Sequence, residues 1–111
     1  MLYTLTEFAD APHVPFDLDG RILFTSEKFE LIHLNLKPGE LVQPHAQPFD
    51  VIFFVQDNGG ELSIGTQGTP DGMITLHPSA GSTVTVCGHV QRSWRNTSGS
   101  DIRILVMKLI K

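Results

Sequence analysis

The sequence lacks the features that mark several large classes of protein. Its 111 residues include one cysteine, Cys87, which therefore has no partner for an internal disulfide. The first residues, MLYTLTEFADAPHVPFD, contain acidic side chains and prolines where a signal peptide needs a basic start and an apolar run. We therefore expect a cytoplasmic protein.

It also lacks long apolar runs and clusters of basic residues. The longest apolar run, VIFFV at residues 51–55, is far shorter than the roughly 20 residues that a membrane-spanning helix needs. The 8 lysines and arginines are scattered and the formal net charge is −4, so the chain offers no positively charged stripe for a phosphate backbone. We expect neither a membrane partner nor a nucleic-acid partner.

The sequence does contain the alternation that is typical of β-strands. Apolar residues recur with period two or in short runs, and no stretch has the apolar stripe of an amphipathic helix. Turn formers separate the runs, most clearly DNGG at residues 57–60 and TQGTPDG at residues 66–72. We predict about ten strands by these rules. They include residues 21–25, 28–36, 41–47, 51–56, 61–65, 73–77, 82–87, 92–96 and 102–109.

A chain of this length forms one domain, and many short antiparallel strands are best placed in a sandwich or barrel that hides the sheet edges. We predict a single all-β barrel over residues 21–111, preceded by an arm over residues 1–20 that lies on the barrel or on a neighbouring subunit. Residues 102–109 alternate only partly, so we expect this strand to be buried on both faces, with a partner subunit over one of them.

Two stretches carry motifs. In PGELVQPHAQPFDVIFFVQDNGG, Gly39 and His45 have the spacing of Gly, five residues, His, and in GSTVTVCGHVQRSWRN, Gly81 and Asn96 fit a second motif without a gap. On these residues the chain resembles the cupin family over residues 28–109. The resemblance implies a double-stranded β-helix, the barrel known as the RmlC-like jelly roll.

The sequence departs from the cupin pattern where that family binds its metal. The four ligand positions, a His-x-His pair, a glutamate and a second-motif histidine, correspond here to His45, Gln47, Val51 and Arg92. Arginine stays protonated in proteins, and two unit charges about 4 Å apart interact by about 4 kcal/mol at an effective dielectric constant of about 20. We therefore expect no metal cofactor. In the alternative, a divalent transition metal is held at His45.

The turn before Arg92 also departs from the second motif. The motif's proline and glycine correspond to Cys87 and His89, which allows this turn a different path. Two further histidines, His33 and His77, lie on predicted strands, and whether either one meets His45 in space stays open.

The same positions predict a ligand pocket. Because side chains alternate between the two faces of a strand, residues 45 and 47 should point inward together, and residues 51, 53 and 55 should also point inward. A cavity with a few polar groups between apolar walls binds small organic molecules. The arginine fork pairs with a carboxylate or phosphate, unless Arg92 instead forms a structural ion pair with Asp50 or Glu40. The predicted pocket residues are His45, Gln47, Val51, Phe53, Arg92 and Trp94.

Three functions agree with this pocket. The one we favour is a metal-free binding module for a small, anionic metabolite. The second is a metal-dependent cupin enzyme, a dioxygenase or isomerase, with a non-standard site built on His45. The third is a metal-free isomerase or epimerase with His45 as the base, for which the sequence offers no acid because Tyr3 lies in the arm.

The apolar residues also predict a homodimer. The VIFFV run and the hydrophobic last strand exceed what the interior of a small barrel can bury, and the N-terminal arm offers a second contact.

Overall fold

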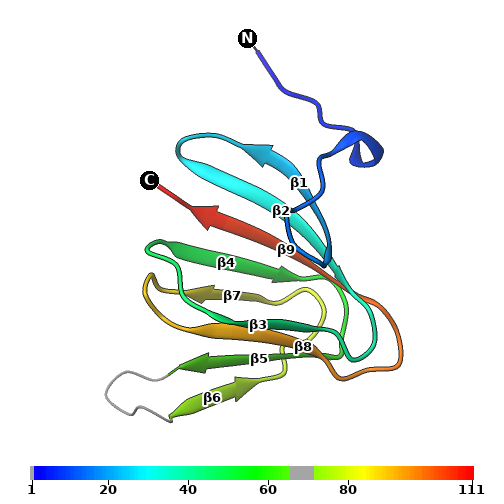
Figure 1. Cartoon of the computed structure of the whole chain (residues 1–111), viewed down its shortest axis with the longest axis vertical. Helices are drawn as coiled ribbons and strands as arrows, with labels where there is room; N and C mark the ends of the chain where they lie inside the picture. The colour runs from blue at the N-terminus through cyan, green and yellow to red at the C-terminus, as the bar shows by residue number, and fades with distance from the viewer. Residues whose placement is uncertain (1, 66–71) are drawn as a thin grey trace.

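The computed structural model describes residues 2–65 and 72–111 (Figure 1). In these residues a short 3-10 helix precedes nine strands, whose ends lie within two residues of those predicted. The all-β prediction is confirmed. The turn expected at residues 66–72 lies, except for Gly72, outside the described residues. The elements are η1 (Phe8–Asp10), β1 (Asp19–Thr25), β2 (Phe29–Leu36), β3 (Leu41–His45), β4 (Asp50–Val55), β5 (Gly60–Gly65), β6 (Met73–Leu76), β7 (Thr83–Val86), β8 (Arg92–Asn96) and β9 (Ile102–Leu109).

The strands form two antiparallel sheets that enclose the core. One sheet has five strands in the order β1-β2-β9-β4-β7, and the other has four in the order β3-β8-β5-β6. Strands far apart in the sequence therefore lie side by side. The last strand, β9, pairs with β2 along its whole length on one side and with β4 on the other, at the centre of the larger sheet (Figure 1).

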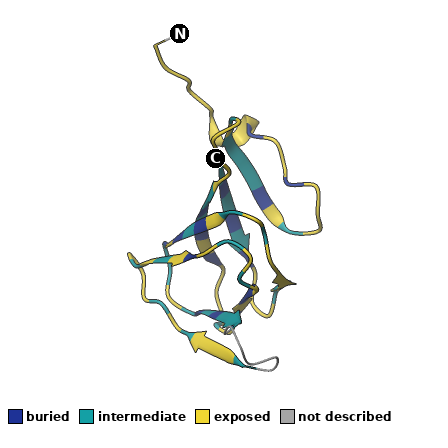
Figure 2. Cartoon of the chain, turned by 90° about the vertical axis from the view of Figure 1, so that its left-hand side faces the viewer, coloured by how far each residue is buried: buried dark blue, intermediate teal, exposed yellow. Residues whose placement is uncertain are grey.

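The buried core follows from the alternation of inward and outward side chains along each strand. In β4, the residues predicted to point inward, Val51, Phe53 and Val55, are all buried, whereas Asp50 and Phe54 are exposed. The same alternation in β2 and β9 places further apolar residues in the core, and Figure 2 shows which parts of the strands are buried. Most of the core is contributed by Ile32, Leu34, Leu36, Leu62, Trp94, Ile102, Ile104 and Val106.

In the single chain, strand β9 is buried on one face, and cover of its other face by a partner subunit stays a prediction. Ile102, Ile104 and Val106 are buried, but Arg103 is exposed and Leu105 is only partly buried. The strand thus alternates like its neighbours. Its incomplete alternation in the sequence arises because its outward positions are also mostly apolar.

The outer face of the five-stranded sheet carries a continuous set of apolar side chains. The strand register places Leu31, Met107 and Ile52 in one row across β2, β9 and β4, and Leu105 beside Phe54 in the next. We call this set the outer apolar face. Its members are Phe24, Phe29, Leu31, Ile52, Phe54, Leu105, Met107 and Leu109.

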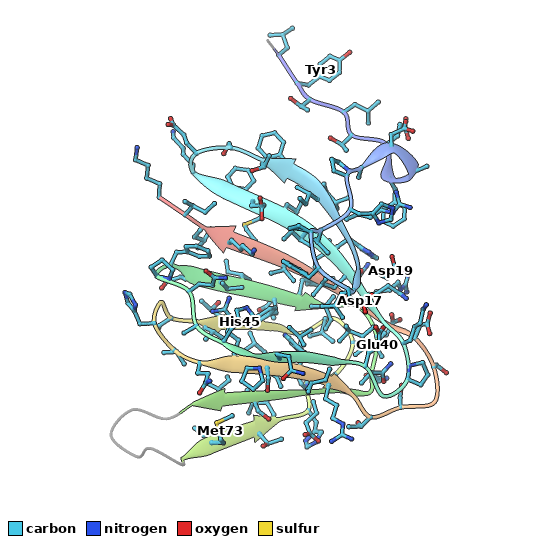
Figure 3. The ribbon with its side chains drawn as sticks, viewed as in Figure 1. Tyr3, Asp17, Asp19, Glu40, His45 and Met73 are labelled. Carbon is cyan, nitrogen blue, oxygen red and sulfur yellow. The ribbon has the colours of Figure 1, made fainter. Side chains whose placement is uncertain are left out.

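The N-terminal segment is held to the barrel by Arg21 of β1. Its guanidinium Nη1 donates hydrogen bonds to the carbonyl oxygens of Phe8, Ala9 and Ala11 at 3.1, 3.0 and 3.3 Å, and the group lies over the Phe8 ring. Val14 is buried against the core. Residues 2–7, including Tyr3, extend away from the barrel (Figure 3). No helix among the described residues is long and apolar enough to cross a membrane.

Candidate ligand pocket

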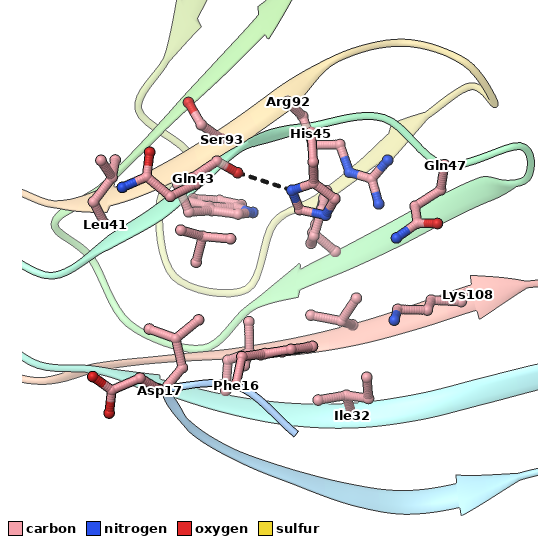
Figure 4. Close-up of a pocket in the computed structure, with 16 residues that line it drawn as sticks. Phe16, Asp17, Ile32, Leu41, Gln43, His45, Gln47, Arg92, Ser93 and Lys108 are labelled. Atoms are coloured by element: carbon pink, nitrogen blue, oxygen red, sulfur yellow. Dashed lines mark hydrogen bonds between the residues drawn. The ribbon is translucent and has the colours of Figure 1, made fainter. Parts of the chain in front are cut away.

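A cavity of about 530 Å³ lies between the two sheets (Figure 4). Its walls come from β3 and β8 of one sheet, from β2, β4 and β9 of the other, and from residues 16–18 of the N-terminal segment. Pockets for small molecules in proteins measure about 300–1,000 Å³. The cavity is therefore large enough for a small organic ligand.

Pairing of β3 with β8 brings two of the predicted site residues together. His45 lies opposite Arg92, and Val42 lies opposite Trp94, with an irregularity in the register between the two pairs. Pro44 lies within this irregular stretch, on an edge strand, where a missing backbone N–H is tolerated. The pairing thus places His45, the last residue of β3, beside Arg92, the first residue of β8.

Arg92 is a buried cation without a partner among the described residues. It is 3% exposed, and its Nε and Nη1 atoms have no hydrogen-bond partner within residues 2–65 and 72–111. Burial lowers the pKa of its guanidinium, because loss of water disfavours the charged form. The two carboxylates considered as ion-pair partners bind elsewhere: Asp50 accepts a hydrogen bond from the Gly88 amide at 2.8 Å, and Glu40 accepts one from the Lys37 amide at 2.7 Å.

The other two polar residues that were predicted also line the cavity. The Nδ1–H of His45 donates to the carbonyl oxygen of Gln43 at 2.9 Å, so that in the neutral ring Nε2 carries the lone pair. The side-chain amide of Gln47 extends into the cavity (Figure 4). The cavity therefore offers an acceptor and an amide close to the Arg92 guanidinium.

Two of the three predicted apolar residues form part of the wall. Phe53 and Trp94 meet edge to face, with ring centroids 5.4 Å apart and planes at 80°. Trp94 is 1% exposed, and its Nε1–H has no acceptor among the described residues. Val51 points inward as expected but is completely covered by the core and does not line the cavity.

Sequence reasoning missed a second cation in the pocket, Lys108. It lies on the inward face of β9, and its Nζ is 3.5 Å from Oε1 of Glu30 on the neighbouring strand β2. The sequence could have indicated Lys108, because residues 102, 104, 106 and 108 share one face of the strand. Phe16, Asp17 and Leu18 were missed as well, and the sequence carries no local signal for them.

The turn before Arg92 is built with an unusual residue. His89, which stands where the cupin motif has glycine, has a φ of 65°, in the left-handed region that glycine adopts most readily. Its backbone N–H donates to the carbonyl oxygen of Gln47 at 2.6 Å. This contact connects the turn to the segment that carries two of the pocket residues.

The residues present do not fit a transition metal. His33 lies on the outer face of its sheet, edge-on to Phe8, and His77 is an exposed residue 3.4 Å from Glu61, so neither lines the cavity with His45. Within the part of the chain that the structure describes, no three His, Cys, Asp or Glu side chains gather as a metal site. Protein sites for such metals supply three or four ligands.

Comparison with known proteins identifies the fold. No protein-family model and no curated protein sequence matches the chain. Among solved structures, an RmlC-like cupin family protein with a double-stranded β-helix fold from Methanocaldococcus jannaschii has a TM-score of 0.74 at 17% identity, over 98% of this chain and 92% of that one. KdgF from Halomonas sp. has a TM-score of 0.73 at 12% identity, over 98% and 96%.

A third structure, Drosophila melanogaster CENP-C bound to CAL1, has a TM-score of 0.82 at 13% identity and covers 94% of this chain and 84% of that one. At these identities the similarity concerns the fold. The chain has the double-stranded β-helix fold of cupins, as the sequence predicts.

Proposed function

We propose that this chain is a metal-free binding protein for a small metabolite that carries an anionic group, with the anion on Arg92. The observation that carries the proposal is the burial of Arg92 at 3% exposure with two of its guanidinium nitrogens unpartnered among the described residues. A buried charge is costly unless it is paired and hydrogen-bonded. An anionic ligand in the adjoining cavity supplies that pairing.

The neighbouring groups orient such a ligand. A guanidinium holds a carboxylate through two parallel N–H···O bonds, which fixes both position and direction. The Gln47 amide, the Nε2 of His45 and the Nε1–H of Trp94 can then bond to further polar atoms of the ligand. These groups give the pocket its selectivity, while the apolar walls supply burial.

The proposal that the protein binds no metal rests on the side chains that would have to serve as metal ligands. His45 is accompanied by an amide and by the permanent charge of Arg92, which repels a divalent cation. We also retain the cytoplasm as the compartment, on the sequence arguments given above.

A metal-free acid–base enzyme is the second candidate, and Lys108 favours it. The sequence offered His45 as a base without an acid, and the cavity brings in Lys108 as a group that can donate a proton. Loss of turnover in both His45→Ala and Lys108→Met, with ligand affinity retained in both, would establish this function over simple binding.

A homodimer is the assembly that we propose. The outer apolar face spans β1, β2, β9 and β4, and Phe54 within it is 39% exposed. Contiguous apolar patches of this kind mark interaction sites on soluble proteins. A protein of the same fold, CENP-C, has been solved bound to another protein, CAL1, so the fold is compatible with a protein partner.

The binding proposal is tested by calorimetric titration of matched acid and amide forms of one ligand, taken from a thermal-shift screen. The native protein should bind the acid more tightly. In Arg92→Met, which keeps most of the stem, the acid should lose about 2–5 kcal/mol of binding free energy, and the amide much less.

The matched control is Arg95→Met, because Arg95 lies on the same strand but is exposed. It should leave both affinities unchanged. Equal binding of acid and amide by the native protein, or the same loss for both in Arg92→Met, would refute the anion site.

A further inference from the structure

The pocket is divided into a polar end and an apolar end. His45 and Arg92 pair where β3 ends and β8 begins, and Lys108 comes from the end of β9 in the opposite sheet. Figure 4 shows Gln47 and Lys108 at the same end of the cavity, well separated from Phe16, Asp17 and Leu41. The polar groups of both sheets thus meet at one end.

The polar end has one positive charge that the protein does not balance. Lys108 is balanced by Glu30, with Nζ and Oε1 3.5 Å apart, whereas Arg92 forms no ion pair within the described residues. The charges of Arg92, Lys108 and Glu30 therefore sum to one positive charge. A ligand with a single negative charge neutralises it, whereas a dianion leaves a buried negative charge without a partner.

The end near Phe16 is lined mainly by hydrocarbon. Three polar residues also border it: Asp17 and Gln43 are exposed residues at its rim, and Ser93 alternates along β8 with the inward Arg92 and Trp94. Leu34 and Val42 line this part with hydrocarbon, together with the ring of Phe16. Inside this rim, the hydroxyl groups of a sugar acid would lose their water without finding partners, which opposes binding. An alkyl or aryl group gives up no hydrogen bonds to water when it enters this part, and the burial of its apolar surface is favourable.

The segment before β1 closes this end. Two backbone hydrogen bonds fix its base, from the Val14 N–H to the Gly20 carbonyl at 2.9 Å and from the Ile22 N–H to the Pro12 carbonyl at 2.7 Å. Between them the chain turns tightly, and Phe16 lines the cavity although it is 56% exposed. The Phe16 ring is therefore positioned to cover the far end of a bound molecule.

We propose that the ligands of this pocket are monocarboxylic acids with an alkyl or aryl body, bound with the carboxylate on Arg92 and the body directed toward Phe16. This inference rests on the proposed function, since it requires the anion site, and it adds the ligand class. Phosphate esters and sugar acids are poor ligands of such a pocket.

The experiment measures affinities of the native protein by calorimetry. The probes are straight-chain monocarboxylates from butanoate to decanoate, 3-phenylpropionate and its amide, glucuronate, and inorganic phosphate. Affinity should rise about fourfold for each added methylene until the apolar end is filled, because each buried CH₂ contributes that much. Glucuronate and phosphate should bind more than tenfold more weakly than 3-phenylpropionate.

A pair of variants tests the orientation. Phe16→Ser should reduce the affinity for octanoate several-fold and leave butanoate unchanged, because only the longer chain reaches the covered end. Tyr3→Ser is the control, since Tyr3 is also an exposed aromatic residue of the N-terminal segment but does not line the cavity. It should change neither affinity.

The outcomes separate this inference from the proposed function. If the acid is preferred to its amide but glucuronate or phosphate binds as tightly as 3-phenylpropionate, the ligand class is wrong and the anion site stands. If 3-phenylpropionamide binds as tightly as the acid, the anion site itself is wrong. Failure of every monocarboxylate to bind at millimolar concentration overturns the ligand class, and so does an affinity that does not change with chain length.

Discussion

His45 on β3 lies directly opposite Arg92 on β8, with the two residues paired across the four-stranded sheet. In the cupin motifs that the sequence resembles, both positions hold histidines that bind the metal. In this chain the two positions also face each other, but one of them holds a permanent cation.

This relationship predicts that a metal site can be rebuilt with few changes. In Gln47→His/Arg92→His, three imidazoles would line one cavity, and three histidines are a known ligand set for zinc. We expect the native protein to carry no stoichiometric transition metal after purification without a histidine tag, and the double variant to bind about one zinc ion per chain. Elemental analysis measures both.

The control replaces the exposed arginine of the same strand. Gln47→His/Arg95→His gains the same number of histidines, but Arg95 does not line the cavity. It should bind no more zinc than the native protein. Close to one metal ion per native chain, removed by His45→Ala, would show that the site still works as a metal site.

A second prediction concerns the turn that leads to Arg92. His89 is the one residue other than glycine with a positive φ in the described parts of the chain, and the left-handed region costs a side-chain-bearing residue about 1–2 kcal/mol. Because glycine also loses more chain entropy on folding, His89→Gly should raise the free energy of unfolding by about 0.5–1 kcal/mol. Urea denaturation measures the change.

The reverse substitution serves as the control. Gly81 has a φ of 90°, and a Cβ added there would meet no atom within 4 Å, so Gly81→Ala tests backbone strain alone. It should lower the free energy of unfolding by about 1 kcal/mol. A destabilised His89→Gly would mean that the imidazole makes contacts that outweigh the strain.

The strands and their inward faces could be predicted because they depend on local alternation. Val51, Phe53 and Val55 are buried as their spacing requires. His45 and Arg92 could be placed together because two motifs of fixed spacing carry them. Whether a given inward side chain reaches the cavity could not be predicted, since it depends on packing, and Val51 is covered by the core.

The missed residues depend on contacts between distant parts of the chain. Lys108 reaches the cavity only because β9 inserts between β2 and β4, an order that no local pattern specifies. Phe16 reaches it because Arg21 and the backbone around Val14 hold the N-terminal segment against the barrel. A sequence pattern shows that a segment is extended but not where it lies.

A third prediction tests the proposed dimer. Sedimentation velocity at micromolar concentration should give the mass of a dimer, and Phe54→Lys should give a monomer, because it places a charge in the outer apolar face. Ile74→Lys is the matched control: Ile74 is an exposed apolar residue on β6 of the other sheet, and its variant should stay dimeric. A monomeric native protein, or equal effects of both variants, would contradict the interface.

The last prediction concerns acid stability and His33. Burial and the charge of Arg103 lower the pKa of His33 below 6.5 in the folded chain, although the charges of Asp19 and Asp57 oppose the shift. The unfolded chain therefore takes up the proton first as the pH falls. The contribution of His33 to stability should be complete above its unfolded pKa, decrease below about pH 6.5 and be lost as the pH falls through the folded value. The measurement is the free energy of unfolding in urea between pH 5 and 8 for the native chain and for His33→Gln, which cannot titrate there. The native curve should fall more steeply toward acid, and parallel curves would show that the folded protein leaves His33 unperturbed.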